Sequence, residues 1–151
     1  MNQSLLSRRA SAAGFTLIET LVVLAIAGIL SSIAYPSFAS VMHKVHRSDA
    51  LVAMMQIRLV QERFRADNPS YGTLADIGVS SNSAARHYTL SVTEHSQNGF
   101  EAIAEATGAQ QADASCRVLK LTLTGVDVGY ASGPDRAALN PDSVNRQCWR
   151  L

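Results

Sequence analysis

The hydrophobic pattern of this chain changes after its first forty residues. Residues 15–39 form a nearly continuous apolar run, FTLIETLVVLAIAGILSSIAYPSFA, in which Glu19 is the only charged side chain. About 20 apolar residues in a helix cross the hydrocarbon core of a bilayer, so the run predicts a membrane-spanning helix. The preceding residues 1–14 are polar, with Arg8 and Arg9 and no acid. The positive-inside rule therefore predicts a cytoplasmic start and an exported C-terminus.

Helical periodicity continues beyond the apolar run. In residues 41–64 apolar side chains recur at helical spacing in two neighbouring stripes, and polar side chains fall on the other side. The first stripe is Val45, Val52, Met55 and Leu59; the second is Ala53, Ile57, Val60 and Phe64; the polar side is Lys44, Arg47, Arg58, Gln61, Glu62 and Arg65. Asn68-Pro69 ends the pattern, because a residue before proline avoids helical geometry. One helix over residues 15–67 is predicted.

The remaining chain reads as a loop followed by short strands. Residues 69–86 are rich in Gly, Ser and Asn and predict a connecting loop. Apolar and polar residues then alternate from Tyr88 and from Phe100, separated by the turn signal Asn98-Gly99, and again from Leu119. Thr124-Gly125 predicts a turn into a fourth strand over residues 126–131, and residues 132–147 read as irregular. The predicted fold class is α+β, with the second half of the long helix packed on a four-stranded antiparallel sheet.

Charge and motif content exclude several function classes. From Met42 onward eleven Lys and Arg balance eleven Asp and Glu, which argues against a general nucleic-acid binder. The sequence contains no nucleophile elbow, P-loop, zinc-protease helix or EF-hand loop. We therefore expect neither an enzyme nor a cofactor.

Two cysteines, Cys116 and Cys148, lie in the last third of the chain. Their separation fits no zinc site. If the first helix exports the rest, they meet an oxidising compartment, where a pair forms a disulfide; two buried free thiols are the alternative. Closing this loop contributes roughly 3–4 kcal/mol in the chain-entropy description.

Glu19 separates three interpretations of the apolar run. An ordinary secretory signal has a shorter apolar region and a small-residue cleavage site, which is missing here. A plain signal anchor leaves Glu19 unexplained, although a carboxylate within a membrane costs about 2.5–3.5 kcal/mol on insertion scales. A processed assembly signal accounts for both features.

The run GFTLIETLVVLAIAGIL, residues 14–30, resembles the type III signal of type IV pilins. The resemblance implies a leader over residues 1–14, cleavage between Gly14 and Phe15, and N-methylation of Phe15. It further implies that Glu19 acts in assembly by meeting the amine of a neighbouring subunit and that Pro36 interrupts the helix. The implied domains are the leader, a transmembrane and filament-core helix over residues 15–41, and a globular head over residues 42–151.

The head resembles that of minor pilins of the PilE type through the stretch QERFRADNPSYGTL, Asn98-Gly99-Phe100 and the terminal Cys148-Trp149. The implied function is a structural minor pilin of a type IV pilus, serving pilus biogenesis, twitching motility and adhesion. Implied partners are major and minor pilins, a prepilin peptidase, the assembly platform and the inner membrane, before display on the pilus. A major pilin, a DNA-binding minor pilin for DNA uptake, a type II secretion pseudopilin and an unrelated anchored domain remain alternatives.

Other candidate chemistry is weaker. His43 and His46 share a helix face but lack a nearby third metal ligand, so contact with lipid headgroups is favoured. Irregular spacing of Asp127, Asp135 and Asp142 gives calcium binding little support. For DNA, the candidate contacts near the C-terminus are Arg136, Arg146 and Arg150 beside Trp149.

Overall fold

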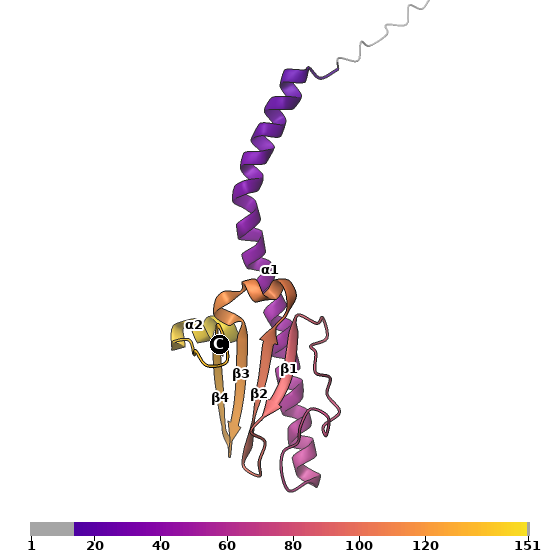
Figure 1. Ribbon diagram of the computed structural model, residues 1–151, viewed down its shortest axis with the longest axis vertical. Coiled ribbons are helices and arrows are strands. Elements are labelled where there is room, and N and C mark those ends of the chain that lie inside the picture. Colours follow the sequence, from indigo (N-terminus) through magenta and orange to yellow (C-terminus); the bar gives the residue numbers. More distant parts are fainter. Residues whose placement is uncertain (1–13, 151) are drawn as a thin grey trace, which may run out of the picture. The chain divides into compact units, whose positions relative to one another are not determined.

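The computed structural model describes residues 14–150, with the side chain of Pro36 excepted, and divides into two units, Met1–Phe38 and Ala39–Leu151. The leader predicted over residues 1–14 therefore lies almost wholly outside the described residues. The long helix begins in the first unit, and all strands belong to the second (Figure 1). In chain order the elements are α1 (Leu17–Asp67), β1 (Tyr88–Thr93), β2 (Gly99–Ala106), η1 (Gly108–Ala112), η2 (Ala114–Cys116), β3 (Val118–Thr124), β4 (Asp127–Gly133) and α2 (Asp142–Trp149).

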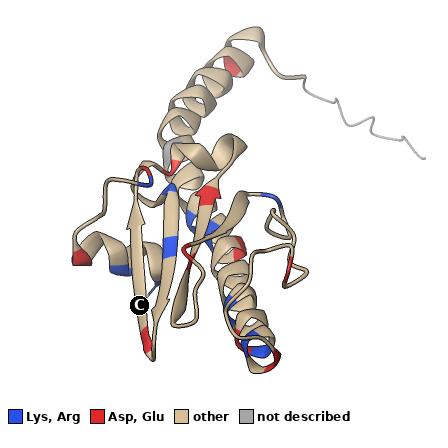
Figure 2. Cartoon of the chain, turned by 60° about the horizontal axis from the view of Figure 1, so that its bottom comes forward, with Lys and Arg blue, Asp and Glu red and all other residues tan. Residues whose placement is uncertain are grey.

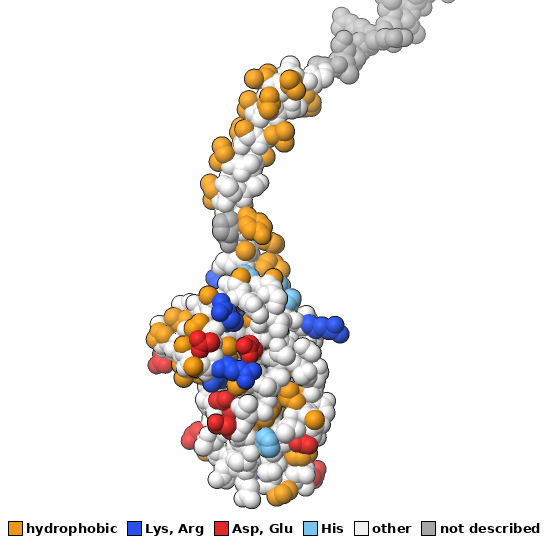
Figure 3. Space-filling view, in the orientation of Figure 1, with side chains coloured by type: hydrophobic (Ala, Val, Ile, Leu, Met, Phe, Trp, Pro, Cys, Tyr) orange, Lys and Arg blue, Asp and Glu red, His pale blue; other side chains and the backbone are white. Residues whose placement is uncertain are grey.

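The part of α1 in the first unit is an apolar helix with exposed side chains. The most apolar 18-residue window of α1 has a mean hydropathy of 2.3 and is 0% buried within the chain. Figure 3 shows hydrophobic side chains along this stretch on the face in view, and Glu19 is its acidic residue. By length and composition alone, this helix can cross a membrane.

The second unit is a four-stranded antiparallel sheet with the later part of α1 against one face. The strand order β1-β2-β3-β4 follows the sequence, and consecutive strands pair throughout. Leu90, Ala104 and Leu119 are neighbours across three strands and are buried on the face that meets the helix. The predicted α+β fold, with α1 packed on the sheet, is confirmed.

Only one of the two apolar stripes predicted on α1 enters this core. The buried helix positions are Ala50, Ala53, Met54 and Ile57, which include members of the second stripe. The first stripe faces outward, with Val52 67% exposed. Spacing identified both stripes but could not tell which one meets the sheet.

Two polar residues predicted on the solvent side of α1 are buried instead. Gln61 is 0% exposed; its Oε1 accepts from the Gly72 N–H at 3.0 Å, and its Nε2 donates to the Gly72 carbonyl at 2.6 Å. This pair of bonds satisfies the amide and holds the loop after α1 on the helix. Arg47 is the second such residue.

The Asn98-Gly99 signal marks a different structure from the predicted tight turn. Residues 94–98 form a five-residue connection, and Gly99 begins β2 opposite Thr124. A Cβ at Gly99 would lie 1.9 Å from the Leu123 carbonyl oxygen, so glycine is required by close approach of two strands. Gly125, by contrast, has φ of 62° at the first position of the two-residue β3–β4 turn, as predicted from Thr124-Gly125.

The C-terminal region is more regular than predicted. Residues 132–147 were expected to be irregular, but α2 starts at Asp142 and runs to Trp149. Its sequence carries few apolar residues, and Val144, Cys148 and Trp149 supply its inner side. The short helices η1 and η2 also replace part of the loop expected before β3.

Neighbouring segments cover both edges of the sheet. On the β1 edge, Ser81 accepts from the Leu90 N–H at 2.8 Å, and Ser83 donates its N–H to the Tyr88 carbonyl at 2.9 Å. On the β4 edge, Asn145 Nδ2 donates to the Tyr130 carbonyl at 2.7 Å, and Trp149 Nε1 donates to that of Ala131 at 2.8 Å. Loop backbone on the β1 edge and α2 side chains on the β4 edge thus bond to backbone groups that edge strands ordinarily expose.

Candidate functional site

The N-terminal motif forms a capped helix start. Gly14, Phe15 and Thr16 precede α1, and Phe15 is 81% exposed. Thr16 Oγ1 accepts from the backbone N–H of Glu19 at 3.3 Å, which satisfies one of the free donors in the first turn. Thr16-Leu17-Ile18-Glu19 has the Thr-x-x-Glu pattern of a capping box. Glu19 thus lies in the first turn of α1, where the helix dipole favours a carboxylate.

The helix continues through position 36. The α1 assignment is unbroken from Leu17 to Asp67, so Pro36 does not end it. Proline lacks an N–H, so the Ser32 carbonyl has no i+4 backbone partner. Ser32 itself donates from Oγ to the Ile29 carbonyl at 2.7 Å. The missing bond is a local weakness within a continuous helix.

A buried ion pair fixes the start of the head. Arg47 meets Asp113 through two nitrogens, with Nη2 2.7 Å from Oδ1 and Nε bonded to Oδ2. The side chains of Arg47 and Asp113 are 11% and 8% exposed. Arg47 Nη1 also donates to the Gln147 carbonyl at 3.3 Å, so one side chain joins α1 to the segment before η2 and to α2.

Gln110 is the centre of a polar cluster beside this pair. Its Oε1 lies 3.3 Å from His43 Nδ1 and 3.2 Å from His46 Nδ1, while its Nε2 lies 3.0 Å from Tyr88 Oη and 3.2 Å from Asp113 Oδ2. His43 and His46 therefore both contact Gln110 through Nδ1. Burial raises the pKa of Tyr88 to about 12.

A second cluster joins α1 to the loop before β1. Asp49 accepts from Ser83 Oγ at 2.5 Å and from the backbone N–H groups of Ala85 and His87 at 3.1 and 3.3 Å. Burial opposes ionisation of Asp49, but these bonds outweigh it and hold its pKa below the ordinary value. The His87 ring stacks on His46, with centroids 3.8 Å apart. Within residues 14–150, no group of three or more His, Cys, Asp and Glu is arranged to hold a metal.

The predicted disulfide is present. Cys116 and Cys148 are bonded, with Cα atoms 5.5 Å apart and a sequence separation of 32 positions. Both are buried, and the bond links the end of η2 to the last turn of α2. α2 is therefore held to the core covalently as well as through its packing.

Trp149 does not offer the exposed face that stacking on DNA requires. It is 4% exposed, and its ring lies 4.8 Å from that of Tyr130. Arg136, another of the suggested DNA contacts, pairs with Glu105 at 2.9 Å. Figures 2 and 3 show Lys and Arg interspersed with Asp and Glu on the head. The predicted aromatic platform is wrong, because Trp149 belongs to the core.

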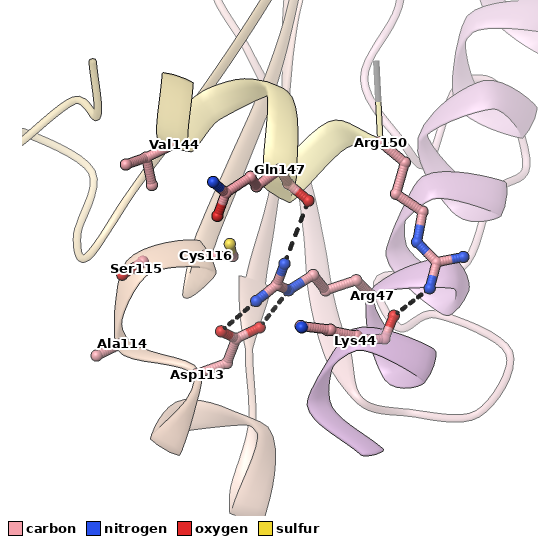
Figure 4. A pocket seen from close by; sticks show the side chains of 9 residues that line it. All are labelled: Lys44, Arg47, Asp113, Ala114, Ser115, Cys116, Val144, Gln147 and Arg150. Atoms are coloured by element: carbon pink, nitrogen blue, oxygen red, sulfur yellow. Dashed lines mark hydrogen bonds and ion pairs between the residues drawn. The ribbon is translucent and has the colours of Figure 1, made fainter. Parts of the chain in front are cut away.

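One pocket of about 530 Å³ opens beside the disulfide. Lys44, Arg47 and Arg150 line it together with Asp113, Ser115 and Gln147 among others (Figure 4). Arg150 donates from Nη2 to the Lys44 carbonyl at 2.9 Å. Its backbone is left-handed, with φ of 57°, where it ends α2. Neither this pocket nor the Gln110 cluster is visible in sequence, since each joins segments more than sixty residues apart.

Comparison with known families covers both parts of the chain. Residues 9–35, which include Gly14, Phe15 and Glu19, match the prokaryotic N-terminal methylation motif. Residues 36–120 match the family described as type IV minor pilin ComP, DNA uptake sequence receptor.

Two curated relatives are pilins. The chain is 30% identical over 102 residues to the type IV wide pilus major component PilA4 of Thermus thermophilus, covering 65% of this chain and 76% of the relative. It is 35% identical over 63 residues to the type IV major pilin protein PilA of Myxococcus xanthus, covering 42% of this chain. That match spans only 29% of the Myxococcus protein's length. With its methylation motif, apolar helix and sheet-covered head, the chain belongs to the type IV pilin family, in which its match over residues 36–120 is to the minor pilins.

Proposed function

We propose that this minor pilin is made as a precursor and processed before assembly. A prepilin peptidase removes residues 1–14 by cutting between Gly14 and Phe15, and Phe15 becomes the N-methylated terminus. The match to the methylation motif over residues 9–35 supports this step. Phe15 is exposed and precedes the first helical turn, so the bond to Gly14 is accessible outside regular structure.

The observation that carries the assembly role is the exposed apolar helix. Its 18-residue window is 0% buried in the chain's own fold, which leaves its hydrophobic surface for lipid or for other helices. In our proposal residues 15–41 hold the precursor in the inner membrane, with the N-terminus cytoplasmic and the head, residues 42–151, periplasmic. The assembly platform then transfers the helix into the core of a pilus among major and minor pilins, and Pro36 gives the helix local compliance there. The subunit is structural and serves pilus biogenesis, twitching motility and adhesion.

Glu19 has a specific part in this transfer. Cleavage creates an amino group at Phe15, a cation in apolar surroundings, and an unpaired charge there is costly. The carboxylate of Glu19 in the first turn of α1 neutralises the terminal amine of a neighbouring subunit. The pair thereby favours insertion at the correct axial position.

Mass spectrometry of the chain isolated from host cells tests the processing step. The expected N-terminus is methylated Phe15, in the membrane and in sheared pili alike. A chain that starts at Met1 in both fractions contradicts the proposal. Processing without recovery in any pilus or membrane fraction contradicts the assembly role alone.

DNA binding by the head is a second candidate function, favoured by the match to a family described as a DNA uptake sequence receptor. Arg146 on α2 is exposed, and Arg117 lies next to Cys116, so both are near the disulfide. We propose that such cations contact phosphates, with no stacking on Trp149. The full chain in nonionic detergent is titrated with duplex DNA at several salt concentrations. The measured quantity is the slope of the logarithm of the DNA association constant against the logarithm of the salt concentration. The double variant Arg117→Gln with Arg146→Gln is expected to reduce the size of this slope by about two, while Arg63→Gln on α1 leaves it unchanged. Absence of binding at low salt removes this function.

A further inference from the structure

We infer that the pocket between α1, η2 and α2 binds the phosphodiester headgroup of an anionic lipid. Its residues all belong to the second unit: Lys44 from α1, Ser115 from η2, and Gln147 and Arg150 from the C-terminal region. Its volume of about 530 Å³ lies in the range of small-molecule sites, which suits a headgroup. The inference rests on the membrane position proposed for residues 15–41.

Some of the charges that line the pocket neutralise each other, and an excess of positive charge is left. Arg47 and Asp113 neutralise each other, and Asp113 Oδ2 is also 3.2 Å from Gln110 Nε2, so that carboxylate is fully engaged. Lys44 and Arg150 supply two further positive charges, and among the described residues of the lining Asp113 is the one carboxylate side chain. The pocket therefore favours an anion over a neutral or cationic ligand.

Donor chemistry in the pocket fits phosphate oxygens. Arg150 donates from Nη2 to the backbone carbonyl of Lys44, which anchors Arg150 to α1 and leaves further guanidinium N–H groups to donate. Ser115 contributes a hydroxyl and Gln147 an amide to the same lining (Figure 4). Several charge-assisted donors around one opening are what a phosphodiester requires.

The position of Lys44 in the chain selects a lipid among phosphate sources. Lys44 follows Val41, the last residue of the proposed membrane segment, by three positions, and both lie in α1 within the second unit. At 1.5 Å per residue this separation is about 5 Å, which is the depth of the headgroup layer next to the hydrocarbon core. A basic side chain at that depth is attracted to anionic lipid. While the precursor is in the membrane, the headgroups are therefore within reach of the pocket.

The test uses the full chain in nonionic detergent with phosphatidylglycerol and phosphatidylcholine as probes. Native mass spectrometry reads the amount of each lipid retained. We expect phosphatidylglycerol to be preferred, since its headgroup carries no cation. Lys44→Gln and Arg150→Gln should each weaken its retention about fivefold, the effect of one basic residue at an anionic surface. Arg63→Gln, which removes an exposed charge from the same helix outside the pocket, should not change retention.

Several results overturn the inference. Equal retention of both lipids, or an equal loss in Arg63→Gln, shows that the pocket does not select anionic lipid. Inorganic phosphate or a short DNA duplex is added as a competitor for phosphatidylglycerol. If one of them displaces the lipid, and its own binding is lost in the same two variants, the pocket is assigned to that ligand instead. Circular dichroism of each variant checks folding, and Lys44→Arg, which keeps the charge, should restore retention. Recovery of the same variants in sheared pili tests the assembly role separately. Normal pilus incorporation of a variant that has lost lipid selectivity shows that the two functions are independent.

Discussion

Arg47 and Asp113, separated by 66 residues in the sequence, form a two-pronged ion pair in the interior of the head. Removal of one partner from such a pair leaves a buried charge uncompensated, at a cost of roughly 3–5 kcal/mol. Arg47→Met should therefore lower the free energy of unfolding by about that amount in urea titrations monitored by Trp149 fluorescence. The double variant Arg47→Met with Asp113→Leu should recover much of the loss, because neither charge remains. Equal stability of the single variant and the wild type would contradict a structural role for the pair.

Loss of the Cys116–Cys148 disulfide is expected to destabilise the head. Replacement of both cysteines with serine removes a cross-link over 32 residues, for which the chain-entropy description gives about 3–4 kcal/mol. Thermal unfolding of wild type with and without reductant should show a loss of similar size. The serine variant serves as the control, because reductant should leave its melting temperature unchanged.

Asp49 should make part of the head's stability depend on pH. Its folded-state pKa lies below the ordinary value, so its contribution is present above the unfolded pKa and is lost as pH falls through the folded pKa. The stability difference between wild type and Asp49→Asn should therefore be larger at neutral pH than in strong acid. Urea titrations across that pH range measure the difference. A difference that does not change with pH would show that the charge on Asp49 has no part in holding the loop.

Two substitutions separate the local role of Glu19 from its role in assembly. Glu19→Gln keeps a side chain that completes a capping box but removes the charge. We expect it to be expressed and cleaved, yet strongly reduced in sheared pili. Thr16→Ala removes the hydroxyl that caps Glu19 and should cost about 1 kcal/mol of local helix stability while assembly continues. Incorporation of Glu19→Gln at the wild-type level would refute the proposed charge pairing.

Gly99 tolerates no side chain in this sheet. A Cβ would lie 1.9 Å from the Leu123 carbonyl oxygen, so Gly99→Ala must push β2 away from β3. Overpacking of this kind costs roughly 1–3 kcal/mol, to be read from chemical unfolding. Gly129→Ala in the same sheet is the matched control, since its added Cβ meets Thr122 Oγ1 at 3.3 Å and that side chain can adjust. The lower entropy of the unfolded chain would by itself stabilise both variants. A similar loss in both would therefore contradict a specific close approach at Gly99.

Local signals in the sequence predicted much of the fold. Asn68-Pro69 located the end of α1 at Asp67, and alternation around Tyr88, Phe100 and Leu119 located three strands. Thr124-Gly125 gave the last turn. These features are set by neighbours in the chain, so a pattern of a few residues is enough to find them.

Features that depend on distant partners were not predictable in the same way. Arg47 and Gln61 occupy polar positions of α1 yet are buried. Their polar groups are satisfied there by hydrogen bonds to Asp113 and to the backbone of Gly72, which are distant in sequence or lie in the following loop. α2 was missed because its inner side consists of Val144, Cys148 and Trp149, too few apolar residues for a periodic signal. Pro141 followed by Asp142 and the four-residue step from Val144 to Cys148 were the available signals for it.

The candidate sites show the same difference between features set by neighbours in the chain and features set by distant partners. The motif Gly14-Phe15 with Glu19 is contiguous, so its family resemblance was recognisable from sequence alone, and the methylation-motif match covers it. The pocket of Lys44 and Arg150 joins residues 106 positions apart and needed the fold to be seen.

The closed edges of the sheet restrict how these heads can meet when crowded. Exposed strands invite their counterparts on other molecules to pair with them, and that tendency grows with local concentration. Here the Ser81 and Ser83 backbone bonds to Leu90 and Tyr88 of β1, while Asn145 and Trp149 bond to Tyr130 and Ala131 of β4. Heads gathered side by side along a fibre would therefore resist fusing into a continuous β-structure. The order of the subunits would then be set by contacts between the exposed apolar helices, whose surface the chain's own fold does not bury.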